Sequence, residues 1–361
     1  MRRRLAVPLV CALLLGVACG GGETSQPSSL EAPRPDESPA PNGPADTGAG
    51  VPSGSGPAIP STPSADASRP TGSADASLPP DPAVFAYDRG RPLRVRATDR
   101  RRSADAVSEH VTYAGADGER VPAVLSLPRL VDPPFACIVL GHGFRGDKSS
   151  LPVGDLLARA GFAAFAIDAR AHGERRDDEV LRAVETDAAA LERMLRETVT
   201  DMRRGVDYLA SRAECDPARI GYIGASMGGF LGAMLAGSDE RIQAPVLLVS
   251  GADWTTMLQS SVARAFRERA TPAVIEEARR LLDPIDPIHW VGRISPRPVL
   301  MIAGDADTAV PPASARALHA AANEPKTVVW YDGGHTLPGA QERQRILATV
   351  ASWLVEHLGP A

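Results

Sequence analysis

The sequence is poor in the features that mark several protein classes. Its 361 residues carry a formal net charge of −5, so no excess of positive charge indicates a nucleic-acid partner. It contains four cysteines and no His-Glu-x-x-His motif, Cys-x-x-Cys motif or Asp-rich loop. We therefore predict no metal site, no phosphate site and no cofactor. A hydrophobic content of 43% remains, which suits an ordinary globular core.

The N-terminus has the pattern of an export signal. A basic segment at residues 2–4 precedes an apolar run at residues 5–18, which is too short to span a bilayer as a helix. We predict a signal peptide over residues 1–18. Residues 15–19 resemble a bacterial lipobox, in which Cys19 receives a diacylglycerol and becomes the new N-terminus. Simple secretory cleavage after Ala18 is the alternative, because small residues also suit that cleavage.

Both alternatives predict an extracytoplasmic protein. Gly20 stands where an aspartate would favour retention in the inner membrane, so the lipobox resemblance implies an outer-membrane lipoprotein. Without the lipid, the protein would be periplasmic or secreted, and a membrane is a partner only if Cys19 is acylated. The following segment is rich in Pro, Ser, Ala and Gly and cannot bury enough surface to offset its ordering entropy. We predict a disordered tether over residues 19–82 and one catalytic domain over residues 83–361.

Two cysteines lie within the predicted catalytic domain. Cys137 falls in an expected strand and Cys215 just before another. An oxidising compartment permits a disulfide. The sequence leaves open whether the two residues pair or remain buried thiols.

The catalytic domain alternates between strand and helix patterns. Two alternating runs form an expected hairpin, and six short apolar runs read as buried strands. The expected strands are residues 106–113, 120–127, 135–140, 161–167, 219–223, 244–250, 298–303 and 327–331, and the expected helices include residues 151–160, 183–212 and 343–357. This order predicts an α/β fold with a mostly parallel eight-stranded sheet and helices on both faces.

A G-x-S-x-G pentapeptide, residues 224–228, lies between an expected strand and an expected helix. That context is typical of a nucleophile elbow, in which small neighbours allow a sharp turn and leave Ser226 exposed. A serine hydroxyl needs a base, and the base needs an orienting acid. Asp305 and Asp307 follow one later strand and His335 follows the next, which is the chain order expected for this fold.

Four motifs together resemble an α/β-hydrolase of the dienelactone hydrolase, acyl-peptidase and small-esterase branch. They are residues 141–144 with Lys148, the elbow at 224–228, the acid loop at 304–311, and residues 334–335. The resemblance implies that Ser226 is the nucleophile, Asp307 rather than Asp305 the acid, and His335 the base. True dienelactone hydrolases carry cysteine in the elbow, so serine here indicates an esterase-type relative.

The oxyanion hole requires two backbone donors. The elbow supplies the N–H of Met227, and the resemblance gives the other N–H to Phe144. In this fold a histidine at the position of His142 organises the oxyanion turn, and the turn that holds His172 mainly shapes structure. Lys148 is expected to form a structural ion pair.

An insertion over residues 252–292 predicts a small helical cap above the active site. Within it, residues 254–268 and 272–282 have helix patterns. Met257, Phe266 and Trp290 are candidates to line a substrate pocket together with Phe144, and ordinary core packing is the alternative for each.

The leading hypothesis is a serine hydrolase that cleaves small carboxylic esters through an acyl-enzyme. A peptidase of the same fold is the first alternative, and a non-catalytic surface binding protein is the second, because a fold does not determine a function. A small-molecule ester is the expected partner. The sequence does not indicate the acyl group or the oligomeric state.

Overall fold

The computed structural model describes residues 81–150 and 153–359, so the predicted signal peptide, Cys19 and nearly all of the predicted tether lie outside the described residues. The strands are β1 (Arg96–Arg102), β2 (Ala106–Ala114), β3 (Arg120–Pro128), β4 (Phe135–Gly141), β5 (Ala163–Ile167), β6 (Cys215–Ala225), β7 (Val246–Leu248), β8 (Val299–Gly304) and β9 (Lys326–Tyr331).

The helices connect these strands and cover them. They are α2 (Gly154–Arg159), α3 (Asp178–Ala183), α4 (Ala188–Ala210), α5 (Met227–Ser238), α6 (Trp254–Met257), α7 (Arg264–Arg269), α8 (Pro272–Leu282), α9 (Pro287–Trp290), α10 (Pro312–Ala321) and α11 (Ala340–Leu358). Short 3₁₀ helices are η2 (Pro82–Phe85), η3 (Gly173–Arg175), η4 (Asp283–Ile285) and η5 (Val291–Ile294).

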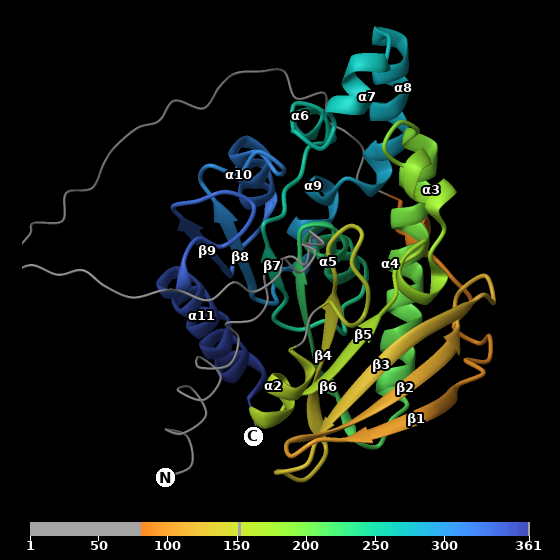
Figure 1. The fold of residues 1–361 in the computed structure, drawn as a ribbon, viewed down its shortest axis with the longest axis vertical. Coiled ribbons are helices and arrows are strands. Elements are labelled where there is room, and N and C mark those ends of the chain that lie inside the picture. The colour runs from red at the N-terminus through yellow and green to blue at the C-terminus, as the bar shows by residue number, and fades with distance from the viewer. Residues whose placement is uncertain (1–80, 151–152, 360–361) are drawn as a thin grey trace, which may run out of the picture. The chain divides into compact units, whose positions relative to one another are not determined.

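All nine described strands form one sheet in the order β1-β2-β3-β5-β4-β6-β7-β8-β9. The pairs β1-β2, β2-β3 and β3-β5 are antiparallel, and the other five are parallel. Figure 1 shows the sheet crossing the domain, with α4 and α5 against one face and α2 and α11 against the other. The predicted mostly parallel sheet with helices on both faces is therefore confirmed.

Each face of the sheet has its own hydrophobic core. On one face, strand residues such as Val139 and Phe165 pack with Leu195 of α4 and Leu231 of α5. On the other face, Ile138 and Ile302 pack with Leu157 of α2 and Leu354 of α11. Consecutive strand residues Ile138 and Val139 thus face opposite cores, which explains the continuous apolar run in the sequence.

Three elements differ from the sequence expectation. The sheet has nine strands instead of eight because β1 adds an edge strand whose seven residues are all exposed. The long helix expected over residues 183–212 is α4, which begins five residues later, at Ala188, where Asp187 caps it by accepting the N–H of Ala189 at 2.9 Å. The cap segment expected as one helix over residues 254–268 is divided into α6 and α7.

Cys137 of β4 and Cys215 of β6 form a disulfide, with a Cα–Cα distance of 5.8 Å. The sequence left this pairing open. The two strands are neighbours in the sheet, and Phe135 of β4 lies opposite Cys215 in the register. The bridge therefore links two central strands, one of which leads to the expected nucleophile.

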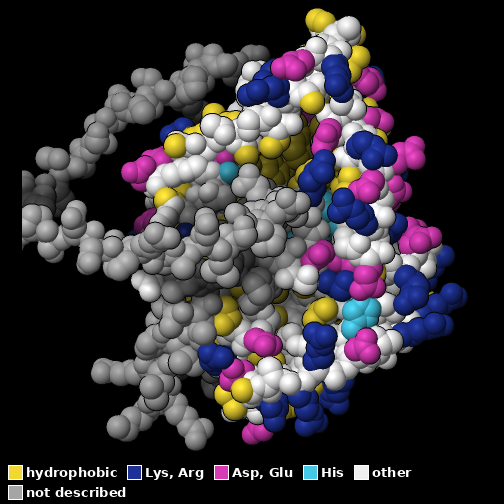
Figure 2. Space-filling model, viewed as in Figure 1, with side chains coloured by type: hydrophobic (Ala, Val, Ile, Leu, Met, Phe, Trp, Pro, Cys, Tyr) yellow, Lys and Arg dark blue, Asp and Glu magenta, His cyan; other side chains and the backbone are white. Residues whose placement is uncertain are grey.

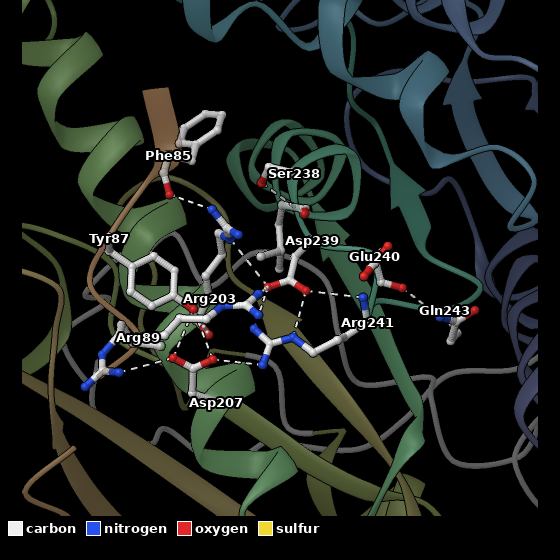
Figure 3. Close-up of polar contacts among 12 residues, drawn as sticks. Phe85, Tyr87, Arg89, Arg203, Asp207, Ser238, Asp239, Glu240, Arg241 and Gln243 are labelled. Atoms are coloured by element: carbon white, nitrogen blue, oxygen red, sulfur yellow. Dashed lines mark hydrogen bonds and ion pairs between the residues drawn. The ribbon is translucent and has the colours of Figure 1, made fainter. Parts of the chain in front are cut away.

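The segment that precedes the sheet is fastened to α4 and to the end of α5 by a polar network (Figure 3). The hydroxyl of Tyr87 donates to the carboxylate of Asp207, with oxygen distances of 2.9 and 3.0 Å. Arg241 bridges two acids, because its guanidinium lies 2.8 Å from Asp207 and 2.6 Å from the fully buried carboxylate of Asp239. Arg203 also contacts Asp239 at 3.4 Å. Each buried charge is thus paired, as burial requires.

Candidate active site

The turn between β6 and α5 carries Ser226 in a backbone conformation that side chains rarely adopt, with φ of 55° and ψ of −123°. Such a conformation costs on the order of 1–3 kcal/mol and persists only where the surroundings impose it. The Ser226 N–H donates to the carbonyl of Leu248 in β7 at 3.0 Å. A Cβ on Gly224 would overlap the backbone of Gly228, so the turn admits only glycine at this position. These contacts hold Ser226 at the tip of a sharp turn.

The three side chains predicted to act together do meet. The Nε2 atom of His335 lies 2.9 Å from the Oγ atom of Ser226, and its Nδ1 atom lies 2.8 Å from Oδ2 of Asp307. Because a carboxylate only accepts, Nδ1 of His335 carries the proton and donates it to Asp307. Nε2 is then free to accept the hydroxyl proton of Ser226. This is the orientation that a general base requires.

Asp307 is held from both of its oxygens. Its Oδ1 accepts the backbone N–H groups of Ala309 at 2.8 Å and Val310 at 2.9 Å, while Oδ2 faces His335. The carboxylate side chain is 2% exposed, and the His335 side chain is 26% exposed. The acid is therefore shielded from water, while the imidazole remains accessible to a substrate.

Asp305 has a different position from Asp307. Its Oδ1 accepts the N–H of Gly333 at 3.0 Å, which joins the loop after β8 to the loop after β9. Nearby, the hydroxyl of Tyr331 donates to the carbonyl of Gly334 at 2.6 Å, one residue before His335. Burial raises the pKa of Tyr331, so this donor keeps its proton at neutral pH. Asp305 and Tyr331 thus support the loop that presents His335.

The turn after β4 lies beside the nucleophile. A Cβ built on Gly143 would lie 3.8 Å from the Cβ of Ser226. His142 fixes the turn, because its Nδ1 donates to the carbonyl of Gly143 at 2.8 Å and its Nε2 accepts the N–H of Ala169 at 3.1 Å. Burial lowers the pKa of His142, which favours the neutral ring that these two bonds require.

Two backbone N–H groups face no acceptor in the described part of the chain. Phe144 follows Gly143 in the turn, and Met227 is the first residue of α5, where a helix has no internal partner for its N–H. The N-terminus of α5 also carries a partial positive charge. Their role as donors to a developing oxyanion stays a prediction.

Lys148 and His172 support the same turn. Lys148 forms ion pairs with the fully buried Asp168 and with Glu174, both at 2.7 Å. The His172 ring lies against the Phe144 ring, edge to face, with centroids 5.4 Å apart. Lys148 is thus in a structural ion pair. The His172 side chain packs against the oxyanion turn, and its contacts among the described residues are with Arg170, His142 and Phe144.

The profile of the prolyl oligopeptidase family matches residues 155–361, which is more than half of the chain. The chain belongs to the prolyl oligopeptidase family. The matched region contains Ser226, Asp307 and His335, and the oxyanion turn precedes it. The predicted resemblance to the acyl-peptidase branch is thus confirmed at the level of the family.

Curated relatives of the chain include a putative hydrolase, YtaP, from Bacillus subtilis. It is 28% identical over 39% of the chain and 52% of its own length. The uncharacterized Escherichia coli K12 protein YfhR is 24% identical over 65% of the chain and 76% of its own length. The uncharacterized peptidase YuxL of Bacillus subtilis is 26% identical over 70% of the chain and 39% of its own length. The chain therefore spans about half of YtaP and less than half of YuxL.

Solved structures with similar folds include both esterases and a peptidase. An acetyl xylan esterase from Paenibacillus sp. R4 superposes with a TM-score of 0.63, 23% identity and coverage of 75% of this chain and 90% of that one. A putative dipeptidyl aminopeptidase IV from Bacteroides ovatus has a TM-score of 0.57, 20% identity and coverage of 70% and 36%. At these identities the likeness shows the α/β-hydrolase fold alone, which confirms the predicted fold class.

The helices α6 to α9 form the predicted insertion and are joined to the acid loop. The N–H of Ser261 donates to the carbonyl of Thr308 at 2.8 Å, one residue after Asp307. The buried carboxylate of Asp286 accepts the N–H of Trp254 at 2.7 Å, so the two ends of the insertion are tied together. Figure 2 shows a hollow with hydrophobic side chains on its floor beside this insertion.

The candidate pocket residues have different environments. Phe144 is 38% exposed and packs against His172, and its place in a substrate pocket stays a prediction. Phe266 is partly exposed on α7, and Met257 is almost buried within the core. Trp290 has no exposed surface and packs edge to face on Phe85 at 4.7 Å. The prediction that Trp290 lines a pocket is therefore not met, because its ring fills the core beneath the insertion.

Sequence reasoning missed an aromatic pair near the nucleophile. Phe230 lies on α5, one helical turn after Ser226, and its ring stacks on Trp254 with centroids 5.4 Å apart. The Nε1 atom of Trp254 is buried without a hydrogen-bond partner. The sequence could have predicted Trp254 at this sheet edge, because Trp254 follows β7 just as Ser226 follows β6.

The described residues contain neither a metal-binding cluster nor a membrane-crossing helix. No group of three or more His, Cys, Asp or Glu side chains among them is arranged to hold a metal ion. In the same part of the chain, no helix has the length and apolar character needed to cross a membrane.

Proposed function

We propose that this protein is a serine hydrolase that cleaves small carboxylic esters through an acyl-enzyme intermediate. The observation that carries this proposal is the continuous hydrogen-bonded series from Ser226 through His335 to Asp307, at 2.9 and 2.8 Å. Two unpaired backbone N–H groups lie beside it, at Phe144 and Met227. The set provides a nucleophile, a base, an orienting acid and an oxyanion site.

The reaction follows from these positions. Nε2 of His335 removes the Ser226 proton as Oγ attacks the ester carbonyl, and the N–H groups of Phe144 and Met227 bind the oxygen that becomes negative. The imidazolium, stabilised by Asp307, then gives its proton to the departing alcohol. His335 then removes a proton from water as its oxygen attacks the acyl carbonyl; the bond to Ser226 Oγ breaks, Oγ regains the proton from His335, and the carboxylic acid leaves. No cofactor or metal is needed for any of these steps.

The decisive experiment is hydrolysis of p-nitrophenyl acetate and butyrate by the wild-type protein and by Ser226→Ala. We expect the variant to lose at least about 10³-fold in kcat. Ser149→Ala removes another serine hydroxyl from a surface loop and serves as the matched control, with unchanged activity. Full activity of Ser226→Ala would refute the proposal. Failure of the wild-type protein to react with a fluorophosphonate probe would support the non-catalytic binding protein.

Peptide cleavage is the second candidate function, and the family assignment is the observation that favours it. The similar acetyl xylan esterases favour ester substrates instead, and this chain covers 90% of one of them but 36% of the similar aminopeptidase. The rates for aminoacyl anilides and for alkyl esters with the same acyl group separate the two functions. We expect kcat/KM for the ester to exceed that for the anilide by at least about 100-fold.

We further propose that the protein acts outside the cytoplasm, held to the outer membrane by a lipid on Cys19. The pattern of residues 1–19 supports export, and the Cys137–Cys215 disulfide suits an oxidising compartment. Incorporation of labelled palmitate into the wild-type chain but not into Cys19→Ser tests the lipid. Label in both proteins or in neither would refute it, and a secreted or periplasmic product would then remain.

A further inference from the structure

The first strand of the sheet is an exposed row of arginines. Residues 88–102 contain seven arginines and two aspartates, whereas the whole chain has a net charge of −5. Every residue of β1 is exposed. Figure 2 shows Lys and Arg side chains gathered along the border of the molecule where Figure 1 draws β1 and β2. The positive charge is therefore local and opposes the overall charge of the protein.

Most of this charge is not neutralised. Arg100 pairs with Glu109 of β2 at 3.3 Å. Within the described residues, no acid or hydrogen-bond acceptor contacts the side chains of four neighbours, which are Arg94, Arg96, Arg101 and Arg102. We call these four side chains the β1 arginines. Free guanidinium groups bind phosphate oxygens in a bidentate manner, so the row suits a surface that presents phosphate groups.

Two exposed apolar side chains stand at one end of the row. Leu130 is 64% exposed and Val131 is 48% exposed. The preceding residue, Arg129, joins them to the β1–β2 turn, because its backbone N–H donates to the carbonyl of Asp105 at 3.0 Å and its guanidinium donates to Ser103. Aliphatic side chains beside arginines are typical of surfaces that bind at the membrane interface. A soluble polyanion would offer these two side chains no apolar region in which to be buried.

β1 crosses the sheet from the edge that carries the active site to the opposite edge. Arg96 lies opposite Thr112, toward the carboxyl ends of the parallel strands, whereas Arg102 lies toward their amino ends. Leu130 and Val131 precede the start of β4, and Arg102 pairs with Val107 at the start of β2. Ser226 lies beyond the other ends of the parallel strands, after β6. Contact through the end of the surface that holds Arg102, Leu130 and Val131 would leave the mouth around His335 open to the aqueous phase.

We propose that the β1 arginines, with Leu130 and Val131, form a docking surface for an anionic phospholipid membrane. Phosphate groups would pair with the guanidinium groups while the two apolar side chains enter the headgroup region. The surface would orient the domain so that substrates reach it from the solution. This proposal rests on the exposed strand and does not require the lipid proposed on Cys19.

The test uses the full chain carrying Cys19→Ser, which has no lipid attachment site. Co-sedimentation is measured with phosphatidylglycerol–phosphatidylcholine vesicles and with phosphatidylcholine vesicles. The uncharged vesicles measure any membrane binding by the apolar run at residues 5–18. The variant replaces the four β1 arginines by glutamine. We expect its affinity for the anionic vesicles to fall at least tenfold, with unchanged hydrolysis of a soluble ester. Raising the salt concentration should likewise weaken the binding of the wild-type surface to the anionic vesicles.

A matched variant removes four other exposed arginines by substitution with glutamine, at Arg182, Arg193, Arg264 and Arg269. It has the same net charge as the β1 variant and should bind like the wild-type chain. Equal losses in both variants would overturn the proposal, since net charge would then determine binding. Unchanged vesicle binding together with self-association of the β1 variant would also overturn it. That result would mean that the arginines protect an edge strand from pairing.

Discussion

Gly228 packs directly against the backbone of Gly141, so that a Cβ on Gly228 would overlap the Gly141 carbonyl group. The turn of the nucleophile and the strand that leads into the oxyanion turn therefore touch without any side chain between them. We expect Gly228→Ala to lower the free energy of unfolding by about 1–3 kcal/mol, because the overlap involves rigid backbone on both sides. The same shift should separate the Met227 N–H from the Phe144 N–H and reduce kcat.

Guanidinium unfolding and p-nitrophenyl acetate hydrolysis measure both effects. Gly334→Ala is the matched control for stability, since a Cβ there would make only an ordinary contact at 3.7 Å. Its free energy of unfolding should stay within about 0.5 kcal/mol of the wild-type value. Equal stability of the two variants would contradict the close approach of Gly228 and Gly141.

Replacement of the two aspartates after β8 should have unequal effects. Asp307→Asn keeps the shape of the side chain but allows His335 to adopt the wrong tautomer, so we expect kcat to fall by about 10³–10⁴-fold. Asp305→Asn retains an oxygen for the Gly333 N–H and should change kcat by less than about tenfold. Steady-state kinetics with one ester substrate compare them. A larger loss for Asp305→Asn would reverse the assignment of the acid.

The site could be predicted because its signals are local and ordered. Ser226 lies in a five-residue motif between strand and helix patterns, and the acid and the base each follow an apolar run. Parallel strands bring their carboxyl ends to one sheet edge, so the order along the chain implies proximity in space. For Phe144 and Met227 the oxyanion roles remain predictions.

Other features depend on contacts that no local pattern records. β1 was missed because both of its faces are exposed, so its sequence has no alternation of polar and apolar residues. Trp290 was expected in a pocket, but its ring is covered by Phe85, from a segment far away in the chain. The later start of α4, at Ala188, had a signal in the sequence, since Asp187 precedes three alanines as a helix cap would.

The disulfide should make a large contribution to stability. It closes a loop with a sequence separation of 78 residues. Disulfides typically contribute about 2–4 kcal/mol, mainly through the reduced entropy of the unfolded chain, and long loops lie at the upper end of that range. We expect the double variant Cys137→Ser, Cys215→Ser to lose that amount in guanidinium unfolding. Dithiothreitol should destabilise the wild-type protein and leave the double variant unchanged. If the double variant and the wild-type protein without reductant had the same midpoint of guanidinium unfolding, the expected contribution of the disulfide would be contradicted.

Buried histidines should make the fold less stable as the pH falls from about 6.5 toward 4. Burial lowers the pKa of His172 to about 4, and burial next to Lys326 and Arg316 lowers that of His319 to about 4. In the unfolded chain both side chains titrate near pH 6.5. Below that pH the unfolded state binds more protons than the folded state, so acidification favours unfolding.

The cost should be on the order of 1 kcal/mol per histidine between pH 7 and pH 5. Urea unfolding at the two pH values measures it in the wild-type protein, His172→Gln and His319→Gln. Each variant should show a smaller pH dependence, because glutamine cannot take up a proton in the unfolded state. An unchanged slope in both core variants would mean that other groups control the acid sensitivity of the fold.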